Sequence, residues 1–187
     1  YFTIEYNSLK NFSLAVFEKM GFTAEESAII TDVLLTSDLY GIESHGVQRM
    51  VRYYNTMKNG RLHMDAKWEV VHETPISAVL DNHGGMGQLV AHHAMNMAIE
   101  KAKKLGAGFV TVRNSNHYGI AGYYAKMAVA WAVSVYFAAF PDEMLTYLQD
   151  GHKLDEFTYK KSLQKITESY RVDKEMKKII KEMRQRG

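Results

Sequence analysis

Two segments decide how this chain is interpreted: Asp38-Leu-Tyr-Gly-Ile-Glu-Ser-His-Gly-Val-Gln-Arg49 and, much later, Arg113-Asn-Ser-Asn-His-Tyr-Gly-Ile-Ala-Gly122. They place His45, His117 and Arg49 beside glycines, a composition that is typical of junctions between helices and strands. Imidazole transfers protons near neutral pH, and guanidinium binds a carboxylate through two parallel hydrogen bonds. The pattern therefore indicates acid–base chemistry on a small organic acid.

The composition is that of an ordinary folded chain, with 187 residues, 47% of them hydrophobic and 24% charged. This length suffices for one sizeable domain or two small ones. The longest apolar stretch, residues 128–140, is shorter than the roughly 20 residues that span a bilayer, and the start of the chain does not resemble a secretion signal. The chain has no cysteine, and its formal charge is only +2. We expect a cytoplasmic protein that binds neither membranes nor nucleic acids.

Helical spacing and capping signals predict three helices in the first 60 residues. The first helix ends at Gly21, which can adopt the left-handed conformation that closes a helix. Thr23 and Glu26 form a capping box, so the second helix should cover about residues 24–40. The third helix should run toward Gly60, and its buried face should consist of the apolar residues at helical spacing: Met50, Val51, Tyr54 and Met57.

The middle of the chain predicts a small sheet with helices, and the end predicts helices alone. Residues 68–74 and 77–81 favour two short strands, a long helix should follow over residues 88–105, and residues 109–112 should form a compact buried strand. His117 then lies just past a strand end, where α/β folds gather ligands. Further helices should continue from Tyr123 toward Trp131 and begin at Pro141, at Asp155 or Thr158, and after Asp173.

The expected fold class is α/β, with a helical N-terminal segment (1–60), an α/β portion with a small mixed sheet (61–135) and a helical C-terminal segment (136–187).

Gly85-Met-Gly87 supplies two glycines of a dinucleotide fingerprint, but Val90 occupies the third position, so a tight structural turn is favoured. His92 and His93 would point about 100° apart on a helix, and no metal site is expected.

His45 and His117 have two interpretations on their residues alone. They can serve catalysis, or they can cap neighbouring elements and satisfy buried carbonyl groups. Composition favours neither interpretation.

Three blocks carry a family resemblance: residues 38–46, residues 84–88 and residues 113–122. Over about residues 4–128 the chain resembles the malate/L-lactate dehydrogenase-like oxidoreductases, which include ureidoglycolate dehydrogenase, diketogulonate reductase and sulfolactate dehydrogenase. The resemblance implies a nicotinamide-binding fold that is not a Rossmann domain. It also implies a homodimer and hydride transfer between NAD or NADP and C2 of a small 2-hydroxy or 2-oxo acid of the malate or lactate type.

The resemblance gives five residues a role. His117 is expected to be the acid–base group, and His45 is expected to polarise the carbonyl or share the proton. The substrate-binding residues are Ser44, Arg49 and Tyr53, with Arg49 holding the carboxylate. No cofactor-binding residues are recognised, and the central region of the family has no visible counterpart in this chain. The alternative to an enzyme is therefore a catalytically incomplete remnant that acts as a binding or dimerisation module.

Overall fold

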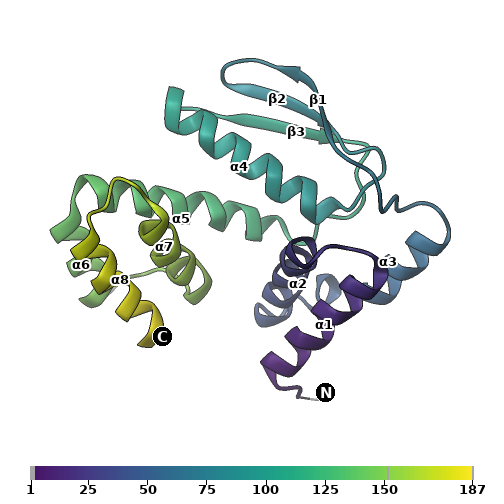
Figure 1. The fold of residues 1–187 in the computed structure, drawn as a ribbon, viewed down its shortest axis with the longest axis horizontal. Helices are drawn as coiled ribbons and strands as arrows, with labels where there is room; N and C mark the ends of the chain where they lie inside the picture. Colours follow the sequence, from purple (N-terminus) through teal and green to yellow (C-terminus); the bar gives the residue numbers. More distant parts are fainter. Residues whose placement is uncertain (1–2, 151, 187) are drawn as a thin grey trace. The chain divides into compact units, whose positions relative to one another are not determined.

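The computed structural model describes residues 3–150 and 152–186 (Figure 1). Contacts group the chain into two compact units, Tyr1–Tyr124 and Ala125–Gly187. The division at residues 60 and 135 rests on composition and stays a prediction. Tyr1 and Phe2, which begin the stretch compared with a secretion signal, lie outside the described residues. None of the helices in the described part of the chain combines the length and hydrophobicity that a membrane span requires.

The first unit begins with four helical elements: α1 (Tyr6–Met20), α2 (Ala24–Leu39), the short 3-10 helix η1 (Glu43–His45) and α3 (Arg49–Lys58). Gly21 closes α1 with a φ of 109°, as predicted. Thr23 and Glu26 form both hydrogen bonds of the capping box that opens α2. The helices pack through a shared cluster of buried apolar residues that includes Phe17, Ile30 and Leu34.

The inward face of α3 differs from the predicted stripe. Val51 is 68% exposed and Tyr54 is 42% exposed, whereas Tyr53 is 5% exposed and belongs to the core. Met50 and Met57 pack against the same cluster, so the prediction was wrong for two of four positions. Tyr53 turns inward because its hydroxyl has hydrogen-bond partners there, a gain that a count of apolar residues does not include.

The sheet consists of β1 (Glu69–Glu73), β2 (Ser77–Asp81) and β3 (Phe109–Arg113), in that order. β1 is antiparallel to β2, and β3 is parallel to β2. Between β2 and β3 the chain forms α4 (Gly87–Leu105), which lies along one face of the sheet and packs on Leu80 (Figure 1). The fold class is confirmed, because the chain is helix-rich with a small mixed sheet.

β3 is not the fully buried strand that the sequence predicted. Its residues alternate between exposed and half-buried, and Phe109 is 63% exposed. Val110 and Val112 turn toward α4, which covers only one face of the strand. A run of β-branched residues resembles a strand covered on both sides, and the sequence does not show which faces are covered.

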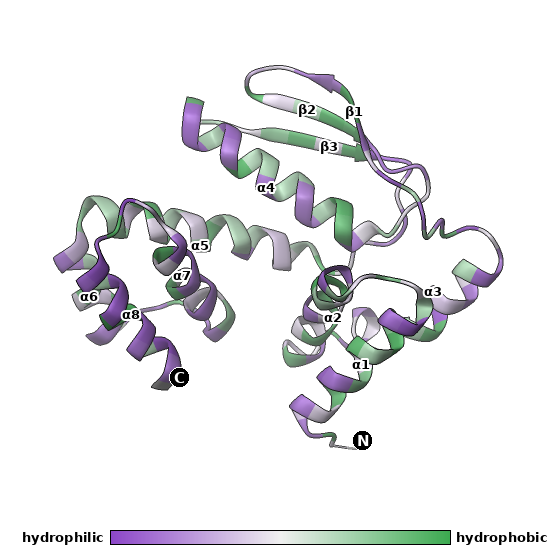
Figure 2. Cartoon of the chain, viewed as in Figure 1, coloured by the Kyte–Doolittle hydropathy of each residue, from purple (hydrophilic) through white to green (hydrophobic). Residues whose placement is uncertain are grey.

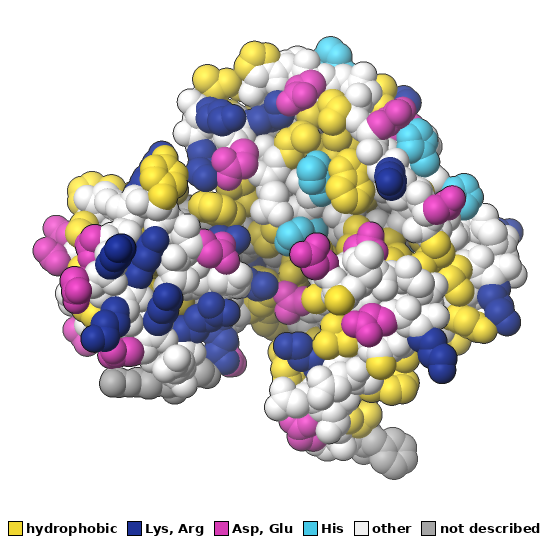
Figure 3. Space-filling model, in the orientation of Figure 1, with side chains coloured by type: hydrophobic (Ala, Val, Ile, Leu, Met, Phe, Trp, Pro, Cys, Tyr) yellow, Lys and Arg dark blue, Asp and Glu magenta, His cyan; other side chains and the backbone are white. Residues whose placement is uncertain are grey.

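The second unit is helical throughout its described elements, with α6 (Pro141–Asp150), α7 (Glu156–Glu168) and α8 (Lys174–Arg186) following the end of α5 (Ala121–Ala139). Three helix starts are confirmed: Pro141 begins α6, Asp155 caps α7, and the Asp173 side chain accepts the Met176 N–H at 2.8 Å. Apolar positions line the inside of this unit, and α8 is mostly hydrophilic (Figure 2). Lys and Arg side chains gather over these helices with Asp and Glu among them, as on a solvated surface (Figure 3).

The start of α4 lies against the loop after β3 because position 87 has no side chain. A Cβ atom on Gly87 would lie 2.3 Å from the Asn116 carbonyl oxygen and 2.4 Å from that of His117. The Gly84 N–H also donates to the Asn114 carbonyl at 2.7 Å. The glycine cluster therefore forms the tight structural turn that the sequence favoured.

Replacing Gly87 with alanine should destabilise the protein, because the new methyl group would overlap two carbonyl groups. Overpacking of this kind costs about 1–3 kcal/mol, so the urea midpoint followed by circular dichroism should fall. Gly122→Ala is the matched control, since a Cβ there would meet nothing within 4 Å and alanine favours a helix. Equal midpoints for the two variants would contradict the steric role of position 87.

Candidate active site

The two segments that the sequence singled out place His45 and His117 side by side. The centroids of the two imidazole rings are 5.2 Å apart, with 38° between the ring planes. His45 ends η1, between α2 and α3, and His117 lies in the loop between β3 and α5. His45 and His117, which are 72 positions apart in the sequence, thus lie close together in the first unit.

The loop that carries His45 is fixed to the end of α2 by Asp38. The Asp38 carboxylate accepts the Val47 N–H at 2.8 Å, and Gly46 lies so close that an added Cβ would be 1.7 Å from the Asp38 Oδ1 atom. Burial raises the pKa of Asp38, and the bond from Val47 opposes this rise. The loop that carries His45 is therefore held by the Asp38 carboxylate, which can approach closely because Gly46 has no side chain.

Ser44 and Arg49 act within the same loop. The Ser44 hydroxyl lies 2.9 Å from His45 Nδ1. The Arg49 Nε–H donates to the Ser44 carbonyl at 2.6 Å, which leaves the terminal nitrogens of the guanidinium for other partners. Ser44 is exposed and Arg49 is half-buried. These two residues orient the loop around His45.

The loop that carries His117 is anchored by Asp81, the last residue of β2, whose side chain is only 5% exposed. Its Oδ2 atom accepts bonds of 2.8 Å from Arg113 Nε and from Asn114 Nδ2, and its Oδ1 atom accepts the His83 N–H at 3.0 Å. The bond from His83 contributes most to lowering the pKa of Asp81, so the carboxylate remains ionised. Asp81 thus fixes the turn from β3 toward His117.

Hydrogen bonds determine which nitrogen of His117 carries the proton. The Nδ1 atom lies 2.8 Å from the Tyr53 hydroxyl oxygen and accepts the Gly119 backbone N–H at 3.2 Å. A backbone N–H can only donate, so Nδ1 is the acceptor and neutral His117 carries its proton on Nε2. Gln88 Nε2 donates to the Tyr53 hydroxyl at 2.7 Å, which leaves the phenol proton for Nδ1.

The surroundings keep both His117 and Tyr53 uncharged. Burial lowers the pKa of His117 to about 4, and Arg49, His45 and Arg52 act electrostatically in the same direction. Burial also raises the pKa of Tyr53 to about 12, although Gln88 and the arginines oppose this rise. At neutral pH the pair is therefore a neutral imidazole and a protonated phenol.

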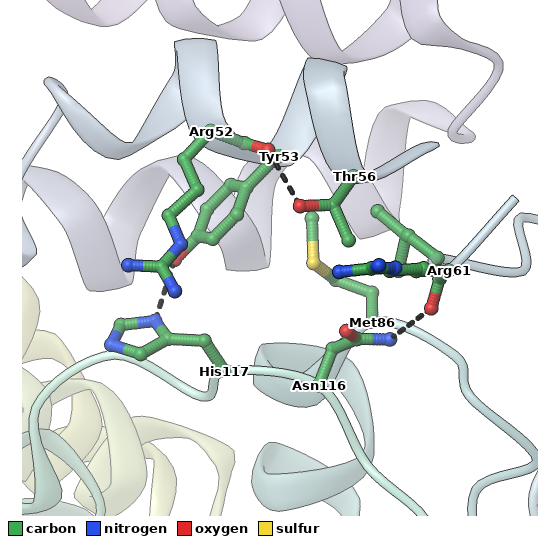
Figure 4. A pocket seen from close by; sticks show the side chains of 8 residues that line it. Arg52, Tyr53, Thr56, Arg61, Met86, Asn116 and His117 are labelled. Carbon is green, nitrogen blue, oxygen red and sulfur yellow. Dashed lines mark hydrogen bonds between the residues drawn. The ribbon is translucent and has the colours of Figure 1, made fainter. Parts of the chain in front are cut away.

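A cavity of about 260 Å³ opens beside His117 and Tyr53 (Figure 4). Its other walls are formed by Arg52, Thr56, Arg61, Leu62, Met86 and Asn116. The Arg52 guanidinium points toward the His117 ring, and that of Arg61 extends into the cavity (Figure 4). Of the expected substrate-binding residues, Tyr53 lines this cavity, whereas Ser44 and Arg49 do not.

The sequence contained a signal for part of this wall. Arg49, Arg52, Tyr53 and Thr56 are spaced at i, i+3, i+4 and i+7 and so share one face of α3. Arg61 comes from the connection after α3 and carries no pattern of its own. The sequence analysis did not identify this polar face, because it oriented α3 by the spacing of its apolar residues.

Comparisons with known proteins identify the family of the chain. Residues 4–138 match the family model for malate/L-lactate dehydrogenase, which confirms the resemblance. The chain belongs to this family. The matched segment of this family member includes both histidines, Tyr53 and every residue of the cavity wall.

Among the relatives of this family member, the malate dehydrogenase of Pyrococcus abyssi is 48% identical over 128 residues, 68% of this chain and 35% of that protein. The L-sulfolactate dehydrogenase of Methanocaldococcus jannaschii is 41% identical over 120 residues, 64% of this chain and 35% of that protein. The structure of malate dehydrogenase from Pyrococcus horikoshii OT3 has a TM-score of 0.67 and 44% identity, and the match covers 69% of this chain and 37% of that one. The chain spans about a third of the length of these relatives.

Besides the cavity of about 260 Å³, a second pocket of about 630 Å³ lies along α4 and β3, and its wall includes Ser115 and Tyr118. The cavity of about 260 Å³ is smaller than the roughly 300–1,000 Å³ of sites for drug-sized ligands. At the start of α4, the carbonyl groups of Asn116 and His117 occupy the space beside Gly87. The cavity beside His117 is therefore too small by itself to hold a nicotinamide dinucleotide.

NMR of the imidazole ring should show His117 titrating with a midpoint of about 4, with the proton of the neutral ring on Nε2. The unfolded chain takes up this proton near pH 6.5 and the folded chain only near 4. The His117 contribution to the free energy of unfolding is therefore present above about pH 6.5 and is lost as the pH falls toward 4. His117→Gln assigns the signal, and a midpoint near 6.5 or an Nδ1–H tautomer would refute this account.

Proposed function

We propose that this chain carries the acid–base and substrate-binding part of an NAD(P)-dependent dehydrogenase that interconverts a small 2-hydroxy acid and its 2-oxo acid. The proposal rests on one observation: neutral His117, with Tyr53 bonded to its Nδ1, lines a cavity of a size for a small acid whose walls include Arg52 and Arg61. Relatives named malate dehydrogenase and L-sulfolactate dehydrogenase support hydroxy-acid oxidoreductase chemistry.

The proton transfer follows from the hydrogen bonds of His117. In the reducing direction, the Nε2–H donates to the carbonyl oxygen of the 2-oxo acid, and the alkoxide that forms takes this proton. Nδ1 takes the phenol proton of Tyr53 in the same step, so the ring stays neutral, as a pKa of about 4 requires. The phenolate is stabilised by the Gln88 Nε2 donor and regains its proton from water. Oxidation follows the reverse order, and the nicotinamide, when bound, exchanges the hydride with C2.

His45 and Arg49 complete the small-acid site in this proposal. The His45 ring lies 5.2 Å from that of His117 and donates a second hydrogen bond to the reacting oxygen, which polarises the carbonyl. Ser44 holds His45 in orientation at 2.9 Å. The terminal nitrogens of Arg49 bind the carboxylate next to C2, because the Nε–H is already bonded to the loop.

A binding module without turnover is the second candidate. The observation that favours it is the small volume of the cavity beside His117, about 260 Å³, which alone would not hold a nicotinamide dinucleotide. The two candidates differ in a single measurable quantity, the oxidation of NADH or NADPH in the presence of a 2-oxo acid. The homodimer that the resemblance implies stays a prediction.

Replacing His117 with alanine should lower kcat for the reduction of a 2-oxo acid by about 100-fold or more, because the proton donor is lost. The assay follows NADH and NADPH separately by their absorbance, with oxaloacetate and pyruvate as substrates. His72→Ala is the matched control, since this histidine lies exposed on β1, away from the cavity. An unchanged kcat for His117→Ala would dismiss the proton-transfer role, and no turnover by the unmodified chain would favour the binding module.

Arg49→Lys should raise KM for the acid severalfold and change kcat little. An ammonium group binds a carboxylate as a point charge and cannot reproduce the planar pair of N–H donors. The single ammonium group of lysine also cannot replace the Arg49 Nε–H bond to the Ser44 carbonyl and bind the substrate at the same time. An unaltered KM would show that the substrate carboxylate is held elsewhere.

A further inference from the structure

We propose that Arg52 and Arg61 form a second anion-binding subsite, so that the preferred acid is dianionic and carries a carboxylate or sulfonate at the end remote from C2. This inference rests on the proposed function for the reacting end of the acid. It goes beyond that function because it selects between the malate and lactate types of substrate.

The two arginines reach the cavity from different elements and have fixed backbones. Arg52 lies on α3 beside Tyr53, and its carbonyl accepts the Thr56 hydroxyl at 2.7 Å. Arg61 follows α3, and its carbonyl accepts a bond of 3.2 Å from Asn116 Nδ2. The next residue, Leu62, is 3% exposed in the core. Both guanidinium groups therefore extend from anchored positions toward the same space (Figure 4).

Within the described residues, the charges of this subsite are not compensated by the protein. The eight residues that line the cavity include no Asp or Glu. Neither Arg52 nor Arg61 forms an ion pair with a carboxylate in the described part of the chain. Both arginines are exposed, so water screens part of the repulsion between these two permanent cations, and a bound anion would relieve the remainder. The effect of Arg52 on the pKa of His117 shows that its charge is felt at the reacting end.

The size of the cavity agrees with a diacid. At about 30 Å³ for each water, a cavity of about 260 Å³ holds roughly nine water molecules, enough for an acid with a short chain and two anionic ends. A 2-hydroxy acid with a single carboxylate would have its reacting end at His117, with the carboxylate bound by Arg49, which is not among the residues that line the cavity. Its other end, a methyl group, would face Arg52 and Arg61 and leave their charges to water.

The test measures binding without cofactor and without turnover. Isothermal titration calorimetry of the full chain should show L-malate binding at least about tenfold more tightly than L-lactate, which has the same hydroxy-acid end. Arg52→Gln and Arg61→Gln should each reduce malate affinity about tenfold and leave lactate affinity unchanged. Arg61→Lys keeps the charge and should retain part of the preference. Arg171→Gln, in the second unit, removes an exposed arginine and should change neither affinity.

The outcomes separate this inference from the proposed function. Equal affinities for malate and lactate, equal losses for both acids in the Gln variants, or no binding of malate at millimolar concentration would each overturn the subsite. Selective binding of malate that depends on Arg52 and Arg61 supports it, even if the chain oxidises no NADH or NADPH. Turnover that depends on His117 but does not distinguish oxaloacetate from pyruvate would support the dehydrogenase and reject the subsite.

Discussion

The absence of a side chain at position 87 is the constraint on which the site depends. It lets the start of α4 lie against the carbonyl groups of Asn116 and His117. The next residue, Gln88, then reaches the Tyr53 hydroxyl, and Tyr53 reaches Nδ1 of His117. The close packing at Gly87 therefore helps to place the Tyr53 hydroxyl at Nδ1 of His117, which favours the Nε2–H tautomer of that ring. Gln88 is fully buried, so this connection does not compete with water.

The ends of the helices could be predicted from the sequence because capping is local. Gly21, the pair Thr23 and Glu26, Pro141 and Asp173 each act within a few residues of the helix end that they define. The covered faces could not be predicted in the same way. Whether β3 is covered on one side or both depends on what packs against it, and that is decided by distant parts of the chain.

The same distinction applies to the site. His45 and His117 could be singled out because each lies in a glycine-bearing segment of recognisable composition, and the family resemblance of these segments implied a common role. Arg61 and Gln88 could not, since their importance comes from a cavity wall and from a hydrogen bond across 35 positions. The proton position on His117 depends on Gly119, whose N–H direction is set by the folded loop.

The charged and the neutral groups of the site respond to different variables. Guanidinium groups keep their charge at every physiological pH, so the electrostatic attraction of Arg52 and Arg61 for any anion depends on ionic strength and not on pH. The neutral ring of His117 contributes no net charge to that attraction above about pH 5, because burial holds its pKa near 4. Acidification to about pH 5 would therefore leave the charge at the His117 ring unchanged, and salt would screen the two arginines without altering the protonation state of the imidazole.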